Sequence, residues 1–153
     1  MTDILIVNRR QVNAEKIAND FSSKFRVRVI PTLRDLGARP DIIIGTIPAN
    51  KTREEDFKIL FEGASESGLC VDMAYKPRKM PLLALAEGQP GWETVPGVEV
   101  LLHQAFDQFE LWTGLKAPLE EMTGMIAASA SQEAEARQEN FDGRLNLRTS
   151  QPP

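Results

Sequence analysis

The stretch from Asp41 to Pro48 reads DIIIGTIP and decides the fold class. The part Asp41–Gly45, nearly all isoleucine, is expected to form a strand, the third along the chain. After Gly45, the hydroxyl of Thr46 and the turn set by Pro48 allow a flat ligand to approach the backbone closely. An ordinary turn from strand to loop explains the same residues equally well.

Strand and helix patterns alternate on both sides of this stretch. The further strands are expected at Ile4–Val7, Arg26–Ile30, Gly68–Met73 and Trp92–Val95. The helices are expected at Gln11–Phe25, Thr52–Ala64, Pro81–Glu87, Gly97–Thr113 and from Pro118 to about Ser129. This alternation predicts an α/β fold, a partial Rossmann-like parallel sheet with helices on both faces. Such sheets bind ligands at the carboxyl ends of their strands.

Length, composition and net charge predict the number of domains and argue against one class of partner. Its 153 residues predict one domain, at residues 1–130, followed by a tail at 131–153. Alanine, serine, glutamine and charged residues dominate the tail, so we expect it to be disordered. The formal net charge of −4 and the pI of about 5.1 argue against general nucleic-acid binding.

The cysteine content and the lengths of the apolar runs predict where in the cell the protein is found. Cys70 is the only cysteine, which excludes an internal disulfide and a cysteine-based metal site. Its place in the apolar run 69–71 predicts a buried, unreactive thiol. The sequence has neither a basic segment followed by an apolar leader nor an apolar stretch of 18 residues. We therefore expect a soluble cytoplasmic protein without membrane contact.

Polar and basic residues follow several of the expected strands. The first strand ends in Asn8-Arg9-Arg10. An arginine at such a strand end suits the 2′-phosphate of NADP, because a guanidinium can grip a phosphate with two hydrogen bonds. Paired arginines in a loop are also commonly just solvated.

Three further side chains have two interpretations each. Tyr75, after the fourth strand, can offer its phenol to a ligand hydroxyl or can cover the core with its tip in water. Gln104 flanks the apolar stripe of the helix at Gly97–Thr113, where it can reach into a cleft or be plain surface. His103, the only histidine, can pair with Glu99 one turn earlier, and a structural or exposed role is favoured.

Five motifs follow one another along the chain. They read NR at 8–9, IGTIP at 44–48, DMAYKP at 72–77, VPGVEVLLHQ at 95–104 and QFELWTG at 108–114. In this order they resemble the nucleotide-binding half of shikimate dehydrogenases, over about Ile4 to Met122. The stretches 44–48, 73–77 and 96–114 most resemble the shikimate dehydrogenase module of the fungal pentafunctional arom polypeptide. They are also similar to the related quinate-pathway repressor proteins.

The resemblance implies a reaction and a set of site residues. The family reaction is the NADP-dependent reduction of 3-dehydroshikimate to shikimate. The implied cofactor-binding residues are Asn8, Arg9, Arg10, Thr46, Ile47, Met73 and Gly97. The implied substrate-facing residues are Tyr75 and Gln104, toward the hydroxyls of shikimate.

Within this set the resemblance implies separate roles. Asn8, Arg9 and Arg10 would hold the adenosine 2′-phosphate, although the family usually has threonine where Arg10 stands. Thr46 and its neighbours would run beneath the nicotinamide ribose, and Met73 and Gly97 would frame the nicotinamide. The family more commonly has aspartate where this chain has proline at position 96.

Two parts that the resemblance calls for are missing from the sequence. The family's first strand and glycine-rich phosphate loop should lie roughly 25 residues before Asn8, yet seven residues precede it here. The catalytic lysine and aspartate belong to a separate N-terminal domain in this family. We therefore predict no catalytic residue and no metal ligand in this chain, and no activity of the chain alone.

A non-catalytic role remains as the alternative. The chain would then be a regulatory or docking module that senses quinate or shikimate-pathway metabolites, related to the quinate repressor. A parallel sheet that lacks one strand leaves a hydrophobic edge, which favours a homodimer or docking to a related polypeptide.

Overall fold

The computed structural model describes residues 3–48, 51–62, 67–76, 80–126 and 128. The chain forms two compact units, Met1–Val100 and Leu101–Pro153, and each is described by itself. The predicted disordered tail at 131–153 lies outside the described residues.

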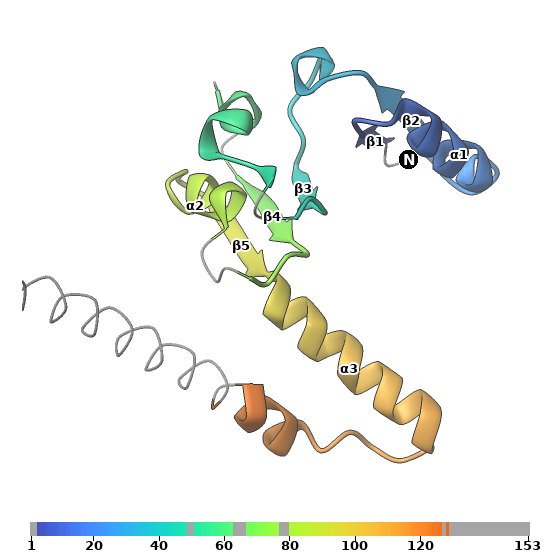
Figure 1. Cartoon of the computed structure of the whole chain (residues 1–153), viewed down its shortest axis with the longest axis vertical. Helices are drawn as coiled ribbons and strands as arrows, with labels where there is room; N and C mark the ends of the chain where they lie inside the picture. The colour runs from blue at the N-terminus through green and yellow to red at the C-terminus, as the bar shows by residue number, and fades with distance from the viewer. Residues whose placement is uncertain (1–2, 49–50, 63–66, 77–79, 127, 129–153) are drawn as a thin grey trace, which may run out of the picture. The chain divides into compact units, whose positions relative to one another are not determined.

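The first part of the chain forms a small β–α–β unit (Figure 1). Strands β1 (Asp3–Val7) and β2 (Arg26–Ile30) pair in parallel, with Asp3 opposite Arg26 and Val7 opposite Ile30. The carboxylate of Asp3 and the guanidinium of Arg26 lie 3.3 Å apart. Helix α1 (Gln11–Phe21) connects the two strands and packs on them, burying Ala14.

A second parallel sheet has the order β3–β4–β5. Its strands are β3 (Ile42–Gly45), β4 (Gly68–Asp72) and β5 (Trp92–Pro96). Helix α2 (Pro81–Glu87) begins with proline at its first position, where the missing N–H is not needed. It packs against β4 and β5. Together they enclose the main core of the described residues.

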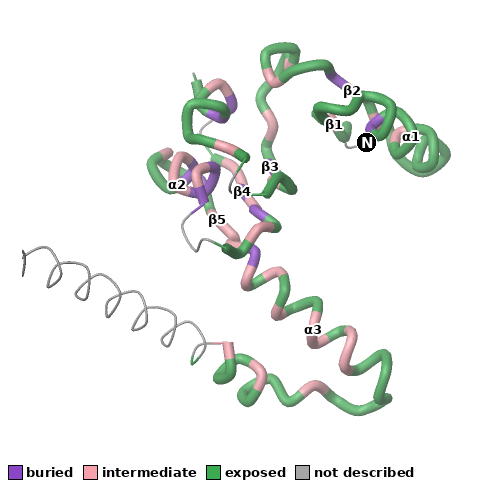
Figure 2. Tube along the Cα trace, viewed as in Figure 1, coloured by how far each residue is buried: buried purple, intermediate pink, exposed green. Residues whose placement is uncertain are grey.

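The main core is formed by buried residues of this sheet, of α2 and of the segment before β4, and buried residues are purple in Figure 2. Its buried members are Ile43, Phe57, Leu60, Phe61, Cys70, Met80, Leu82, Leu83, Ala86 and Trp92. The rings of Phe61 and Trp92 meet edge to face with centroids 5.1 Å apart, a favoured aromatic geometry. Burial, with a smaller contribution from the charge of Asp72, raises the pKa of the Cys70 thiol to about 12. The buried thiol predicted from the sequence is confirmed.

The helix predicted at Thr52–Ala64 is wrong. The described part of this segment holds two short 3₁₀ turns, η3 (Glu54–Asp56) and η4 (Lys58–Leu60). Asp56 accepts a hydrogen bond from the backbone N–H of Arg53 at 2.8 Å, which closes the first turn locally. The N–H of Phe57 then bonds to the carbonyl of Glu54, three residues back. The 3₁₀ turns bury Phe57 and Phe61 as an α-helix would, so the apolar spacing alone does not distinguish the two structures.

Helix α1 ends at Phe21, four residues before the predicted end. The hydroxyl of Ser22 donates to the carbonyl of Asn19 at 2.8 Å, and the backbone N–H of Ser22 bonds to the same carbonyl. Serine side chains compete in this way for the carbonyls that would continue a helix.

Helix α3 (Gly97–Thr113) has the predicted bounds. Gly114 ends it with φ of 69°, a conformation that glycine adopts without steric cost. Residues 119–126 are again helical, so the helix predicted from Pro118 begins at 119, and its end lies outside the described residues.

The α/β class and the parallel pairing are confirmed, and the strands form two sheets in the described residues. Among those residues, no helix is both long and apolar enough to cross a membrane.

Candidate functional site

The ends of β3, β4 and β5 meet at one edge of the second sheet. In the parallel register Gly45 lies opposite Asp72, and Asp72 lies opposite Pro96. One residue further, the backbone N–H of Met73 donates to the carbonyl of Gly45 at 2.8 Å. This edge carries three of the segments that the motifs predict as a site: 46–47, 73–75 and Gly97.

Gly97 allows the start of α3 to touch the end of β4. A Cβ atom at position 97 would lie 2.6 Å from the carbonyl oxygens of Met73 and Ala74. It would lie 2.7 Å from the carbonyl oxygen of Asp72. Any larger side chain would push the two backbones apart. Gly97 therefore belongs to the predicted region as a packing residue that brings two strand ends together.

Gly45 allows a similarly close approach from β3. A Cβ atom there would lie 2.7 Å from Cδ2 of Leu82 and 3.1 Å from Cγ of Asp72. The glycine in the IGTIP motif is thus required by the α2 helix and the carboxyl group beneath it. The chain then emerges at Thr46 and Ile47, which are both exposed.

Asp72 is a buried carboxyl group that the sequence did not single out. Its side chain is 3% exposed, and its Oδ1 accepts a hydrogen bond from the backbone N–H of Ala74 at 3.0 Å. Burial raises the pKa of Asp72, and the hydrogen bond from Ala74 opposes this in part. A charged residue at the last position of an apolar strand was the available signal. The Asp72–Ala74 bond sets the turn that carries Met73 and Tyr75 outward.

Large apolar side chains are exposed where β3 and β4 end. The exposed fractions are 46% for Ile47, 44% for Met73 and 51% for Tyr75. Exposed aromatic and aliphatic side chains beside polar backbone are the usual lining of sites for flat organic ligands. This part of the predicted site is brought together by the fold.

The predicted 2′-phosphate loop follows β1. The backbone N–H of Arg10 donates to Oδ1 of Asn8 at 2.8 Å, so the asparagine shapes the turn. Arg9 and Arg10 are exposed, and neither forms an ion pair with a described residue. Arg10 is the N-cap of α1, whose first turn has no acidic residue and no side-chain cap. Two free guanidiniums beside uncapped helix N–H groups suit a phosphate in charge and in donors.

Gln104 and His103 lie in the second compact unit, on α3. Both side chains are exposed. The His103 ring contacts Phe106 edge to face at 5.7 Å between centroids, and no described residue forms an ion pair with it. The exposed role favoured for His103 is confirmed, and the substrate-facing role of Gln104 stays a prediction.

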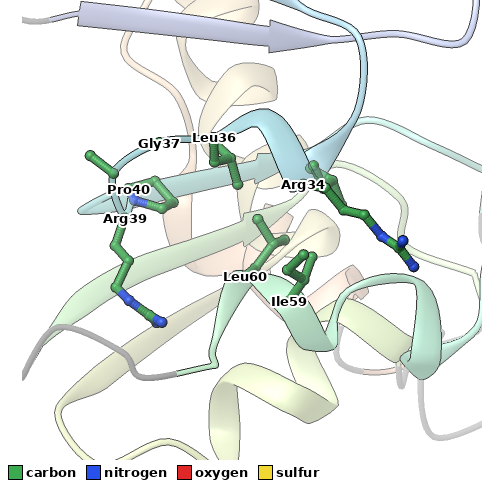
Figure 3. Close-up of a pocket in the computed structure, with 9 residues that line it drawn as sticks. Arg34, Leu36, Gly37, Arg39, Pro40, Ile59 and Leu60 are labelled. Carbon is green, nitrogen blue, oxygen red and sulfur yellow. The ribbon is translucent and has the colours of Figure 1, made fainter.

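A pocket of about 410 Å³ is lined by none of these residues (Figure 3). It is lined by residues 33–34, 36–40 and 59–60, from the connections that flank β3. Arg34 and Arg39 lie on opposite sides of the pocket in Figure 3, and their guanidiniums do not converge on a common point. Among the described residues, no group of three or more His, Cys, Asp or Glu side chains suits a metal ion.

Comparison with known proteins agrees with the motifs. Residues 97–124 match the family model of the shikimate 5′-dehydrogenase C-terminal domain. The chain is 37% identical over 121 residues to the pentafunctional AROM polypeptide of Malassezia globosa, covering 75% of this chain and 8% of that protein.

Two solved structures extend the similarity to the fold. Shikimate dehydrogenase of Mycobacterium tuberculosis superposes with a TM-score of 0.69 at 31% identity, over 83% of this chain and 46% of that one. Shikimate 5-dehydrogenase of Listeria monocytogenes, in complex with shikimate and NAD, gives a TM-score of 0.64 at 26% identity, over 82% and 47%. The chain therefore spans less than half the length of these relatives. In sequence and in fold it is similar to the C-terminal domain of shikimate dehydrogenases, and the resemblance indicated by its motifs is confirmed.

Proposed function

We propose that this chain is a shikimate dehydrogenase-like domain that binds NADP(H) at its strand ends. The observation that carries the proposal is the meeting of the segments after β3, β4 and β5, through the Met73–Gly45 hydrogen bond and the Gly97 contact. Carboxyl ends of parallel strands are the general ligand-binding edge of α/β sheets. Thr46, Ile47 and Met73 would lie along the nicotinamide riboside there.

The choice of NADP over NAD rests on the loop after β1. Arg9 and Arg10 are exposed and free of carboxylate partners among the described residues. A 2′-phosphate would give them a partner of opposite charge, whereas the bare ribose hydroxyl of NAD would not. Asn8 would position the loop through its bond to the N–H of Arg10.

The substrate class is shikimate and 3-dehydroshikimate, or the related quinate, facing Tyr75 and Gln104. Bound NADPH would supply the hydride. A positioned acid would have to supply the proton, and such an acid typically raises the rate by roughly 10²–10⁴-fold. The described residues directly after β3 and β4 offer no exposed acid for this step, because Asp72 is buried. We therefore propose a specificity-determining domain that does not turn over the substrate by itself. The cellular location that we propose for it is the cytoplasm.

A docking or regulatory role is the second candidate. It is favoured by the exposed apolar strand residues Ile42 and Ile44, which are 57% and 61% exposed. This role does not require NADP(H) to bind.

Substitution of Arg9 tests the cofactor proposal. Arg9→Ala should weaken NADPH binding roughly 10- to 100-fold, the equivalent of one charged hydrogen-bond pair, and leave NADH binding nearly unchanged. Isothermal titration calorimetry with both nucleotides measures this. Arg28→Ala is the matched control, because Arg28 is exposed on the neighbouring strand β2 and outside the loop. Equal losses for NADPH and NADH would refute the 2′-phosphate assignment.

A further inference from the structure

Two exposed side chains follow β4 and depend on the backbone that carries them. Met73 is 44% exposed and Tyr75 is 51% exposed. The side chain of Tyr75 forms no hydrogen bond and no ring contact with a described residue. The direction of Tyr75 therefore depends on how the backbone at 73–75 is held.

Hydrogen bonds to β3 and to the side chain of Asp72 hold this backbone. The N–H of Met73 donates to the carbonyl of Gly45 at 2.8 Å, which continues the pairing with β3. The N–H of Ala74 donates to Oδ1 of Asp72 at 3.0 Å. An aspartate that bonds to the backbone two residues ahead forms an Asx turn, which fixes the local path of the chain. The carboxyl group of Asp72 thus sets the direction in which the chain leaves the sheet.

The carboxyl group of Asp72 is itself held by its neighbours. Asp72 is 3% exposed. A Cβ atom at position 45 would lie 3.1 Å from Cγ and 3.2 Å from Oδ1 of Asp72, so β3 is in close contact with the carboxyl group. The backbone carbonyl oxygen of Asp72 lies 2.7 Å from the place of a Cβ atom at position 97. The side chain therefore has little freedom to turn, because packed interiors restrict side chains to the rotamers that fit.

The stability of the fold does not explain a carboxyl group at this position. Burial raises the pKa of Asp72, which means that the charged form is disfavoured there. No described cation forms an ion pair with it. A buried ionisable group without an opposite charge costs free energy of folding, and such groups are concentrated at functional sites. The geometry that Asp72 imposes on the turn explains the residue better than stability does.

We propose that Asp72 is a positioning residue of the candidate site and acts on the ligand through Met73 and Tyr75. The Asp72–Ala74 bond would hold Met73 along the nicotinamide and Tyr75 toward a hydroxyl group of the substrate. Without this bond the turn would have to be ordered when the ligand binds, and the affinity would fall. The inference rests on the proposed function, from which it takes the ligands of Met73 and Tyr75.

Two probes separate the part of the cofactor that Asp72 affects. NADPH contains the nicotinamide, whereas adenosine 2′,5′-bisphosphate contains only the adenosine and its phosphates. Asp72→Ala loses the acceptor for the Ala74 N–H and should weaken NADPH binding roughly 3- to 10-fold, the effect of one hydrogen bond. Binding of the bisphosphate should be unchanged, because the Asn8–Arg10 loop belongs to the other sheet. Isothermal titration calorimetry measures both affinities.

Asp72→Asn is the matched control. Asparagine has nearly the same shape and forms the same turn, so this variant should bind both probes as the unaltered chain does. If Asp72→Ala does not fold, Asp72→Leu takes its place, because leucine is of similar size and lacks the acceptor.

The turn can also be observed without any ligand. Tyr75 is the only tyrosine of the chain, so labelling with 3-fluorotyrosine gives a single ¹⁹F resonance. In Asp72→Ala this resonance should narrow and move toward that of the unfolded chain, and amide exchange at Ala74 should become roughly tenfold or more faster. In Asp72→Asn both should stay as in the unaltered chain.

Any of three results in the binding experiment would overturn the proposal. One is equal NADPH affinity of Asp72→Ala and the unaltered chain. Another is an equal loss for NADPH and the bisphosphate, which would assign the effect to a general loosening of the fold. The third is an equal loss in Asp72→Asn and Asp72→Ala, which would assign it to the charge and not to the turn.

Failure of the proposed function would give a different result. The unaltered chain would then bind no NADPH, whatever residue stands at position 72. Exchange at Ala74 and the Tyr75 resonance would still show whether Asp72 holds the turn. If neither changed in Asp72→Ala, the positioning role would be refuted in either case.

Discussion

At the scale of residues, two close contacts hold the candidate site together. Gly97 rests on the carbonyl oxygens at the end of β4, and Gly45 leaves room for the carboxyl group of Asp72. Both glycines are needed because neighbouring atoms occupy the place of a side chain. Asp72 beneath them is 3% exposed and fixes the turn at Ala74. The geometry of the candidate site therefore depends on two glycines without side chains and on one buried carboxyl group.

Replacing Gly97 should destabilise the first unit. Gly97→Ala places a methyl group 2.6 Å from backbone oxygens, so the backbone must move, at a cost of roughly 1–3 kcal/mol. Gly88→Ala is the control, because its nearest neighbour, the carbonyl of Leu85, is 3.4 Å away, an ordinary contact. Urea unfolding of the three proteins measures the difference. Equal stability of the Gly97→Ala and Gly88→Ala proteins would show that the β4–α3 contact is not tight.

Asp72 should make stability depend on pH. Because its folded-state pKa is raised above the ordinary 3.8, the protonated form favours folding at low pH, and this contribution is lost as pH rises through the folded-state value. Asp72→Asn keeps an oxygen for the N–H of Ala74 and cannot ionise. The variant should therefore gain stability relative to the unaltered chain as pH rises from about 3.8. Urea unfolding across this range would contradict the assignment if the two proteins changed in parallel.

At the scale of elements, periodicity predicted most of the fold, and local hydrogen bonds decided the rest. The strands, α2 and α3 were predicted closely, because their apolar spacing leaves little choice. The segment from Thr52 was not, since burial of Phe57, Leu60 and Phe61 suits both an α-helix and 3₁₀ turns. The side chain of Asp56 settles it by bonding to the N–H of Arg53. The meeting of strand ends followed from parallel topology, whereas the burial of Asp72 arises only from the packed sheet.

Removing the carboxylate of Asp56 should therefore loosen the η3 turn. Asp56→Ala loses the bond to the Arg53 N–H and should lower the free energy of unfolding by about 0.5–2 kcal/mol, the usual cost of a lost cap. Glu55→Ala is the control, because it removes a carboxylate at the preceding position, which is also exposed. Thermal unfolding, followed by circular dichroism, compares the two variants. An identical loss of stability in both would show that the effect comes from removing a negative charge and not from the hydrogen bond to Arg53.

At the scale of the whole molecule, the division into two sheets is the feature that sequence patterns did not predict. Periodicity places strands and their faces, but strand order is set by tertiary pairing. Of the predicted site, the segments after β3, β4 and β5 are brought together. The Asn8–Arg10 loop belongs to the other sheet, and Gln104 to the second unit.

The central claim is that the chain retains the nucleotide-specificity side of a shikimate dehydrogenase-like site. Calorimetric titration of the unaltered chain with NADPH and with NADH tests it most directly. We predict binding of NADPH roughly tenfold or more tighter than NADH, because Arg9 and Arg10 gain a phosphate partner only from the former. Binding of neither nucleotide, or equal affinity for both, would contradict the claim.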